Sequence, residues 1–154
     1  MRMFSRVTAA VLAVALHLAP AVAATSTANM NVGIQITAAC TIGVSDINFG
    51  PQASTVLSAA LTSNATMGGL FSYTCSSGAA PVLTASAGAN FSAGSNQMKG
   101  LATGSFIPYA LNLPAIPLST GVASTAQITA TIPAQATLPA VDSYTDAVVL
   151  TLTY

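Results

Sequence analysis

The chain has 154 residues, of which 53% are hydrophobic, and it carries only three basic and three acidic side chains. Both arginines and the single histidine fall within the first twenty residues, which leaves Lys99 as the one basic side chain of the remainder. That remainder therefore lacks the imidazole base of a Ser-His-Asp or Cys-His relay and the ligands of a histidine zinc site. One lysine does not neutralise the phosphates of a nucleic acid. We expect no enzyme, no cofactor or metal site, no small-molecule substrate and no nucleic-acid partner.

Residues 1–23 have the layout of a secretory signal peptide. A short basic start precedes an apolar run, Val7–Leu18, which a proline and small residues follow. The run is too short and too rich in alanine for a stable membrane span. We predict cleavage after Ala23 or Ala24, which leaves about 130 residues, the size of one exported domain.

Two cysteines, Cys40 and Cys75, remain in the exported part. In an oxidising compartment an even number of cysteines indicates a disulfide, and only one pairing exists here. The bond would close a loop of 35 residue steps, which stabilises a fold by roughly 4 kcal/mol in the chain-entropy description. The alternative, two free thiols or a redox pair, lacks a CxxC spacing and an electropositive neighbour.

Beyond the leader, short runs of Val, Ile, Leu and Thr alternate with Gly, Pro, Asn and Ser, and no helical period is sustained. This pattern is typical of a β-sandwich or barrel built from many short strands. Asp46 is expected to be a turn-forming side chain, and the Gly- and Ser-rich segment Ala87–Gly104 a long exposed connection. The predicted strands are Asn29–Ala38, Cys40–Val44, Thr55–Leu61, Gly69–Cys75, Pro81–Ala87, Phe106–Leu113, Ala126–Ile132 and Tyr144–Tyr154.

The first and last predicted strands alternate most clearly between apolar and other residues. One face of the first strand carries Met30, Val32, Ile34, Ile36 and Ala38, and one face of the last carries Val148, Leu150, Leu152 and Tyr154. Each is simplest to interpret as an ordinary sandwich strand. However, the first lies at the start of the exported part and the last reaches the final residue. We therefore expect an open edge that invites a strand from another chain.

Six short motifs also occur in order along the exported part. They are the alternating N-terminal segment ending at Cys40, Asp46-Ile47-Asn48-Phe49-Gly50, Tyr73-Thr74-Cys75-Ser76, Ile107-Pro108-Tyr109-Ala110-Leu111, Ile132-Pro133-Ala134-Gln135 with Tyr144-Thr145-Asp146, and the alternating C-terminal end. Together they resemble the spore coat protein U domain family, which includes subunits of archaic (Csu-type) chaperone–usher pili.

The resemblance implies an all-β fold, an incomplete immunoglobulin-like β-sandwich that lacks its final strand and is completed by a donor strand from another subunit. Residues 24–38 would be the donor-strand extension and residues 39–154 the pilin-like domain. The apolar face from Met30 to Ala38 would fill a neighbour's groove and contribute on the order of 6–12 kcal/mol. The apolar face from Val148 to Tyr154 would form one wall of that groove and the edge used by a chaperone.

The implied function is that of a structural subunit of a secreted, cell-surface fimbria that serves adhesion or biofilm formation. The implied partners are identical or related pilin subunits, a periplasmic chaperone and an outer-membrane usher. A secreted coat or matrix protein and a monomeric adhesive binding module are alternatives on the same fold. Self-complementation, in which the N-terminal strand enters its own groove, also stays open.

Overall fold

The computed structural model describes residues 23–154, so the expected signal peptide lies, but for its last residue, outside the described residues. The chain divides into two units, residues 1–35 and residues 36–154. Residues 23–39 contain neither strand nor helix, and their side chains are exposed. The expected strand Asn29–Ala38 is therefore not formed within the single chain. A strand requires a neighbour that takes up its backbone hydrogen bonds, and this segment has none in the described chain.

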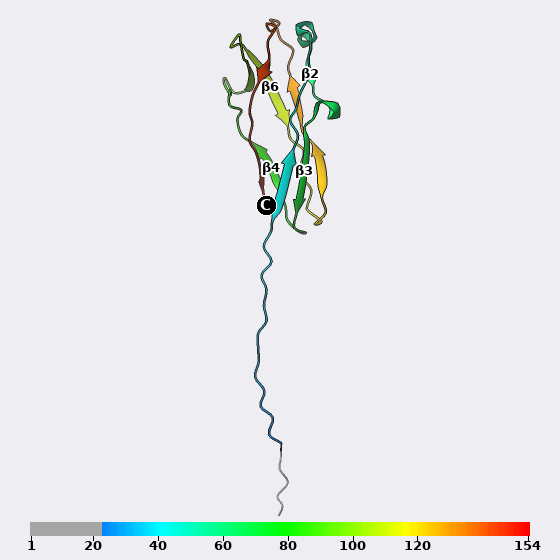
Figure 1. Ribbon diagram of the computed structural model, residues 1–154, viewed down its shortest axis with the longest axis vertical. Helices are drawn as coiled ribbons and strands as arrows, with labels where there is room; N and C mark the ends of the chain where they lie inside the picture. Colours follow the sequence, from blue (N-terminus) through cyan, green and yellow to red (C-terminus); the bar gives the residue numbers. More distant parts are fainter. Residues whose placement is uncertain (1–22) are drawn as a thin grey trace, which may run out of the picture. The chain divides into compact units, whose positions relative to one another are not determined.

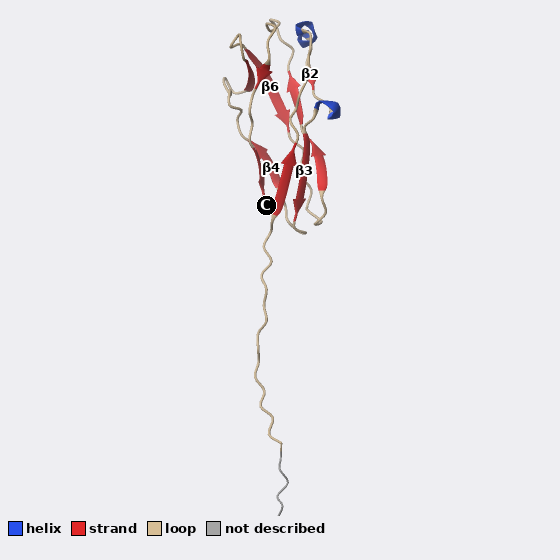
Figure 2. Ribbon diagram, viewed as in Figure 1, coloured by secondary structure: helices blue, strands red, loops and turns tan. Residues whose placement is uncertain are grey.

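Residues 36–154 form an all-β unit whose sheets lie in a sandwich-like arrangement (Figure 1 and Figure 2). Two short 3-10 helices, η1 (Ser54–Ser58) and η2 (Ala65–Met67), are the helical elements of this unit. The strands are β1 (Cys40–Val44), β2 (Leu61–Thr62), β3 (Leu70–Cys75), β4 (Val82–Ala85), β5 (Asn96–Gly100), β6 (Phe106–Asn112), β7 (Ser124–Gln127), β8 (Thr129–Ile132), β9 (Tyr144–Thr145) and β10 (Leu150–Thr153).

The strands pair antiparallel in three sheets, ordered β1-β3-β7, β10-β4 and β2-β8-β6-β5-β9. The alternation of β3 is complete, because Phe71, Tyr73 and Cys75 are buried while the residues between them are exposed. The disulfide between Cys40 and Cys75 is confirmed, and it joins residues that lie opposite each other in the β1–β3 ladder. β1 and β10 each have a single neighbour, so both are edge strands.

The hydrophobic core consists of two clusters. Phe71, Tyr73, Leu83 and Ile128 belong to the first, between the β1-β3-β7 and β10-β4 sheets. The second gathers residues of β6 and β8 with Leu57 of η1. Ile47 and Leu111 pack against both clusters. The core is therefore continuous along the sandwich, and the loop after β1 contributes to its centre.

Two sequence predictions are wrong in type. Most of the expected strand Thr55–Leu61 is the 3-10 helix η1, in which Leu57 alone is buried. The expected connection Ala87–Gly104 contains the strand β5, which pairs with both β6 and β9. A short polar strand such as β5 has weak local preference, and its two neighbours in the sheet determine its conformation.

Two other predicted strands are each divided in two. The segment Ala126–Ile132 forms β7 and β8 in different sheets, and the segment Tyr144–Tyr154 forms β9 and β10 in different sheets. In both cases the inward face continues without a break across the change of sheet. The alternation along the sequence therefore hides the position where the chain crosses over.

Candidate functional site

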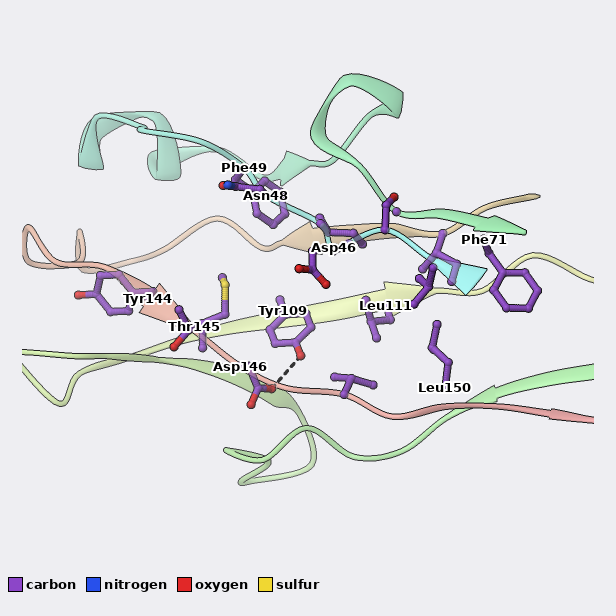
Figure 3. A pocket seen from close by; sticks show the side chains of 18 of the residues that line it. Asp46, Asn48, Phe49, Phe71, Tyr109, Leu111, Tyr144, Thr145, Asp146 and Leu150 are labelled. Carbon is purple, nitrogen blue, oxygen red and sulfur yellow. Dashed lines mark hydrogen bonds between the residues drawn. The ribbon is translucent and has the colours of Figure 1, made fainter. Parts of the chain in front are cut away.

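An open groove of about 540 Å³ runs along the sandwich between β1 and the C-terminal segment (Figure 3). Its floor comes mainly from β3, β6 and the chain around β8, and its two walls come from the segments Ile42–Phe49 and Tyr144–Leu150. Most of the lining is apolar. The apolar and aromatic lining residues are Ile42, Val44, Ile47, Phe49, Phe71, Met98, Tyr109, Leu111, Ile128, Ala130, Tyr144, Val148 and Leu150.

The first wall has an unpaired backbone edge. Ser45 N–H donates to the Leu70 carbonyl at 2.9 Å, and Ser76 N–H donates to the Ala39 carbonyl at 2.8 Å. Residues 39, 41, 43 and 45 therefore face β3, because backbone groups alternate between the two sides of a strand. The N–H and C=O groups of Ile42 and Val44 consequently face the open side of β1. These two side chains are also half exposed, at 49% and 56%, although they line an apolar groove.

The second wall has the same property. Ser86 N–H donates to the Val149 carbonyl at 2.8 Å, and Val149 N–H donates to Ser86 Oγ at 2.9 Å. The backbone groups of Val148 and Leu150 face the opposite, unpaired side by the same alternation. Figure 1 shows β1, in cyan, beside the C-terminal end of the chain. Two free strand edges thus border one apolar floor.

Three polar side chains, Asp46, Tyr109 and Asp146, lie at one level along the length of the groove (Figure 3). Asp46 and Asp146 approach it from opposite walls, with Tyr109 between them (Figure 3). Tyr109 Oη donates to Asp146 Oδ2 at 2.7 Å, and the backbone N–H of Asn90 donates to Asp146 Oδ1 at 3.0 Å. Burial, and then the bond to Asp146, raise the pKa of Tyr109 above its ordinary value. The phenol therefore stays a hydrogen-bond donor at neutral pH.

The Asp46–Gly50 motif shapes the first wall. Ile47 forms an isolated bridge with Gly68, whose φ is +92°, and a Cβ at Gly68 would overlap the Asp46 carbonyl. The turn bond is made by Asn48, whose Oδ1 accepts from Gly50 N–H at 2.8 Å. The expectation that Asp46 is the turn-forming side chain is therefore wrong. Asp46 instead lines the groove, because it continues the inward face of β1.

The third aspartate, Asp142, lies elsewhere and stabilises a turn. Its carboxylate accepts the backbone N–H of Thr103 at 2.7 Å, the Thr103 hydroxyl at 2.7 Å and the N–H of Ala102 at 3.0 Å. The backbone bond from Thr103, followed by its hydroxyl bond, lowers the pKa of Asp142. Within residues 23–154 no three His, Cys, Asp or Glu side chains lie close enough together to hold a metal ion.

The predicted site residues have different places in the structure. Val148 and Leu150 line the groove, and Leu152 packs against the first core cluster. Tyr154 is half exposed and outside the groove lining. The predicted donor residues Met30, Val32, Ile34 and Ile36 are 83–88% exposed, and Ala38 is also exposed. Their role as a donor strand stays a prediction.

Sequence reasoning missed the opposite wall and the polar level. Ile42, Val44 and Asp46 follow Cys40 at intervals of two, and Tyr144 and Asp146 precede Val148 at the same interval. Extending both alternations would have found these residues. The contacts of Tyr109 and Asn90 with Asp146 have no such signal in the sequence, since they join segments 37 and 56 residues apart.

The geometry is suited to one kind of ligand. An extended strand inserted here would find backbone partners on both sides and apolar side chains beneath it, which is the arrangement of β-strand addition. In the part of the chain that the structure describes, no helix has the length and apolar character to cross a membrane.

No curated protein matches this chain. The model of one family, described as the spore coat protein U domain, matches residues 26–151. That match covers both walls of the groove, the disulfide and the exposed N-terminal segment. The chain belongs to the spore coat protein U domain family.

Proposed function

We propose that this chain is a structural subunit of a secreted, cell-surface fimbria, assembled by the chaperone–usher pathway through donor-strand exchange. Its family is associated with pilus and fimbrial subunits. The observation that carries the proposal is an apolar groove bordered by two free strand edges, in a chain that also has an unpaired alternating segment. The occupant of the groove is the segment Asn29–Ala38 of a second copy.

The segment and the groove have complementary surfaces. Four large apolar side chains on one face of the segment are 83–88% exposed, so nearly all of their area is available for burial. Burying them contributes about 1.5–3 kcal/mol each, or on the order of 6–12 kcal/mol together. Backbone hydrogen bonds to β1 and to the C-terminal segment add directionality. A slip of one residue would place Asn31 and Gln35 on the apolar floor, so the register is well specified.

The connection to β1 favours a second copy over the chain's own segment. Ala39 already extends the ladder with β3, because its carbonyl accepts Ser76 N–H at 2.8 Å and its N–H donates to Ser76 Oγ at 3.1 Å. To enter its own groove the chain would have to reverse direction within the donor residues. Ile36 and Ala38 would then form the turn and leave the apolar floor. A neighbour's segment enters without this loss.

The proposed partners follow from the open groove. Before assembly, the exposed apolar floor and two free edges would promote aggregation, so a periplasmic chaperone covers them with a strand of its own. An outer-membrane usher then exchanges that strand for the segment of the next subunit. The resulting fimbria would support adhesion or biofilm formation.

The test is non-reducing SDS gel electrophoresis of exported material, with and without boiling. The wild-type chain is expected to give a ladder that collapses to one band of mature size on boiling, since each groove is closed by a neighbour. A variant that lacks Asn29–Ala38 should give no ladder. The matched control replaces Asn31 and Gln35 by serine, which preserves the length and the apolar face, and it should retain the ladder.

Two results would contradict the proposal. A normal ladder from the deletion variant would show that another segment joins the subunits. A single folded monomer from the wild-type chain in both lanes would show that the sandwich closes itself. The second result would favour a monomeric adhesive module.

A further inference from the structure

We propose that Asp146 is a positioning residue for strand docking: held by Tyr109 and Asn90, its carboxylate fixes the C-terminal segment where it crosses between sheets. The backbone groups of Val148 and Leu150 are thereby aimed into the groove. This inference rests on the proposed function, since it concerns how the same groove receives a strand.

The carboxylate of Asp146 is held at both oxygens. Tyr109 Oη donates to Oδ2 at 2.7 Å from β6, which is the floor of the groove (Figure 3). The backbone N–H and the side-chain Nδ2 of Asn90 donate to Oδ1 at 3.0 and 3.1 Å. Hydrogen bonds to a carboxylate are shorter and stronger than those between neutral groups. The side chain therefore joins the C-terminal segment to the floor and to the loop between β4 and β5.

The position of Asp146 along the chain is the point of crossover. Thr145, directly before Asp146, pairs with Lys99 of β5, whereas Leu150, four residues after Asp146, pairs with Ala85 of β4. Between the two ladders the stretch is bonded to the β4 side of the sandwich: Ala89 N–H donates to the Ala147 carbonyl at 3.0 Å, Ser86 N–H donates to the Val149 carbonyl at 2.8 Å, and Val149 N–H donates to Ser86 Oγ at 2.9 Å. These bonds hold residues 147 and 149 on the side that faces β4 and the loop after it, and none of them reaches β6 on the floor of the groove. Asp146, at the upstream end of this stretch, adds the bond to Tyr109 of β6.

The loop around Asp146 is shaped to receive it. A Cβ at Gly88 would overlap the carboxylate of Asp146, so only glycine permits this approach. Gly88 N–H in turn donates to Asn96 Oδ1 at 2.9 Å, which ties the same loop to β5. The loop that receives Asp146 is therefore itself held in place, by its bond to β5.

The carboxylate of Asp146 lies on an inward face that is otherwise hydrophobic. Its neighbours on that face, Tyr144 and Val148, pack against the second core cluster. Transferring a charged group into such surroundings is costly unless it is hydrogen-bonded. An apolar residue would supply burial alone, which has no direction. A carboxylate held by hydrogen bonds fixes the orientation of the backbone around it. An incoming strand can pair with this edge only if the N–H and C=O groups of the edge keep a fixed orientation.

The test uses fimbriae of the full chain and measures amide hydrogen exchange residue by residue. Tyr109→Phe removes one hydroxyl and keeps the ring, and Asp146→Asn removes the charge. Asp142→Asn is the matched control, because Asp142 lies four residues before Asp146 and holds a turn outside the groove. The amides of Ser72 and Thr74 in β3 serve as the internal reference for the stability of the whole sandwich.

For Tyr109→Phe and Asp146→Asn we expect amide hydrogen exchange at Val148 and Leu150 to accelerate about tenfold. The exchange rates at Ser72 and Thr74 should stay unchanged. We also expect the fimbriae to dissociate in SDS at a lower temperature, whereas Asp142→Asn should leave the exchange rates at Val148 and Leu150 as in the wild type. Equal acceleration at all four amides would overturn the proposal, because it would mean a general loss of stability. Unchanged exchange at Val148 and Leu150 would overturn it while leaving the proposed function intact. A wild-type chain that gives no SDS-resistant ladder would overturn both.

Discussion

Replacing Ile34 by alanine should weaken each junction between subunits without affecting the fold of the subunit itself. Ile34 is 88% exposed in the single chain, so its side chain contributes almost nothing to the stability of residues 36–154. In the proposed junction the same side chain lies on an apolar floor. The effect of the substitution should therefore appear only in the assembled state.

The magnitude follows from the area and volume that are lost. Isoleucine exceeds alanine by three carbon groups, which corresponds to about 2.4 kcal/mol at about 0.8 kcal/mol per group. The cavity left in a packed groove increases the loss, so the expected range is about 2–4 kcal/mol per junction. Each 1.4 kcal/mol is a factor of ten in an equilibrium constant. The junction should therefore weaken by roughly 30-fold to 700-fold.

The assay follows the dissociation of purified fimbriae with increasing guanidinium chloride, read by the loss of the SDS-resistant ladder. Gln35→Ala is the matched control, because it removes a side chain of similar size from the opposite face of the same segment. Ile34→Ala should lower the midpoint clearly, and Gln35→Ala should leave it almost unchanged. Equal midpoints for Ile34→Ala and the wild type would refute the reasoning. A large effect of Gln35→Ala alone would show that the register is shifted by one residue.

Three further predictions concern the subunit itself. Gly88→Ala should destabilise the fold by about 1–3 kcal/mol through overpacking against Asp146, whereas Gly33→Ala has open space around its Cβ and no positive φ, and it should melt like the wild type. A Gly88→Ala variant with the melting temperature of the wild type would contradict the contact. Replacing Cys40 and Cys75 together by serine should cost roughly 4 kcal/mol in chemical denaturation, and reductant should lower the stability of the wild-type chain to that of the variant; a double variant as stable as the oxidised wild type would contradict this. Because the pKa of Asp142 is lowered in the folded chain, its contribution is present above the ordinary aspartate pKa of about 4 and is lost as the pH falls through the lowered value; Asp142→Asn should flatten the acid side of a plot of melting temperature against pH, and an unchanged profile would contradict it.

Local patterns predicted the strands that lie within one sheet. Cys40–Val44 coincides with β1, and the predictions for Gly69–Cys75 and Phe106–Leu113 differ from β3 and β6 by one residue. In these segments the apolar and polar residues alternate because one face packs on the core. The disulfide was also predictable, since an exported chain with two cysteines has a single possible pairing.

The same patterns failed where the chain changes sheets. Both Ala126–Ile132 and Tyr144–Tyr154 keep their inward faces across the crossover, so alternation gives no sign of the break. The strand β5 escaped notice because Asn96 and Lys99 are polar and Gly residues surround them. It forms because β6 and β9 hydrogen-bond to it on both sides.

The sequence by itself determined which side chains turn inward, which cysteines pair and which class of fold and family the chain joins. Only the tertiary structure decided which backbone edges stay unpaired, and hence that Ile42, Val44, Val148 and Leu150 line one open groove. The physical reason is that alternation is a local property of one strand, whereas pairing depends on partners far along the chain. Asp146 illustrates the difference, because its carboxylate is held by hydrogen bonds from Tyr109 and Asn90, which lie 37 and 56 residues away in the sequence.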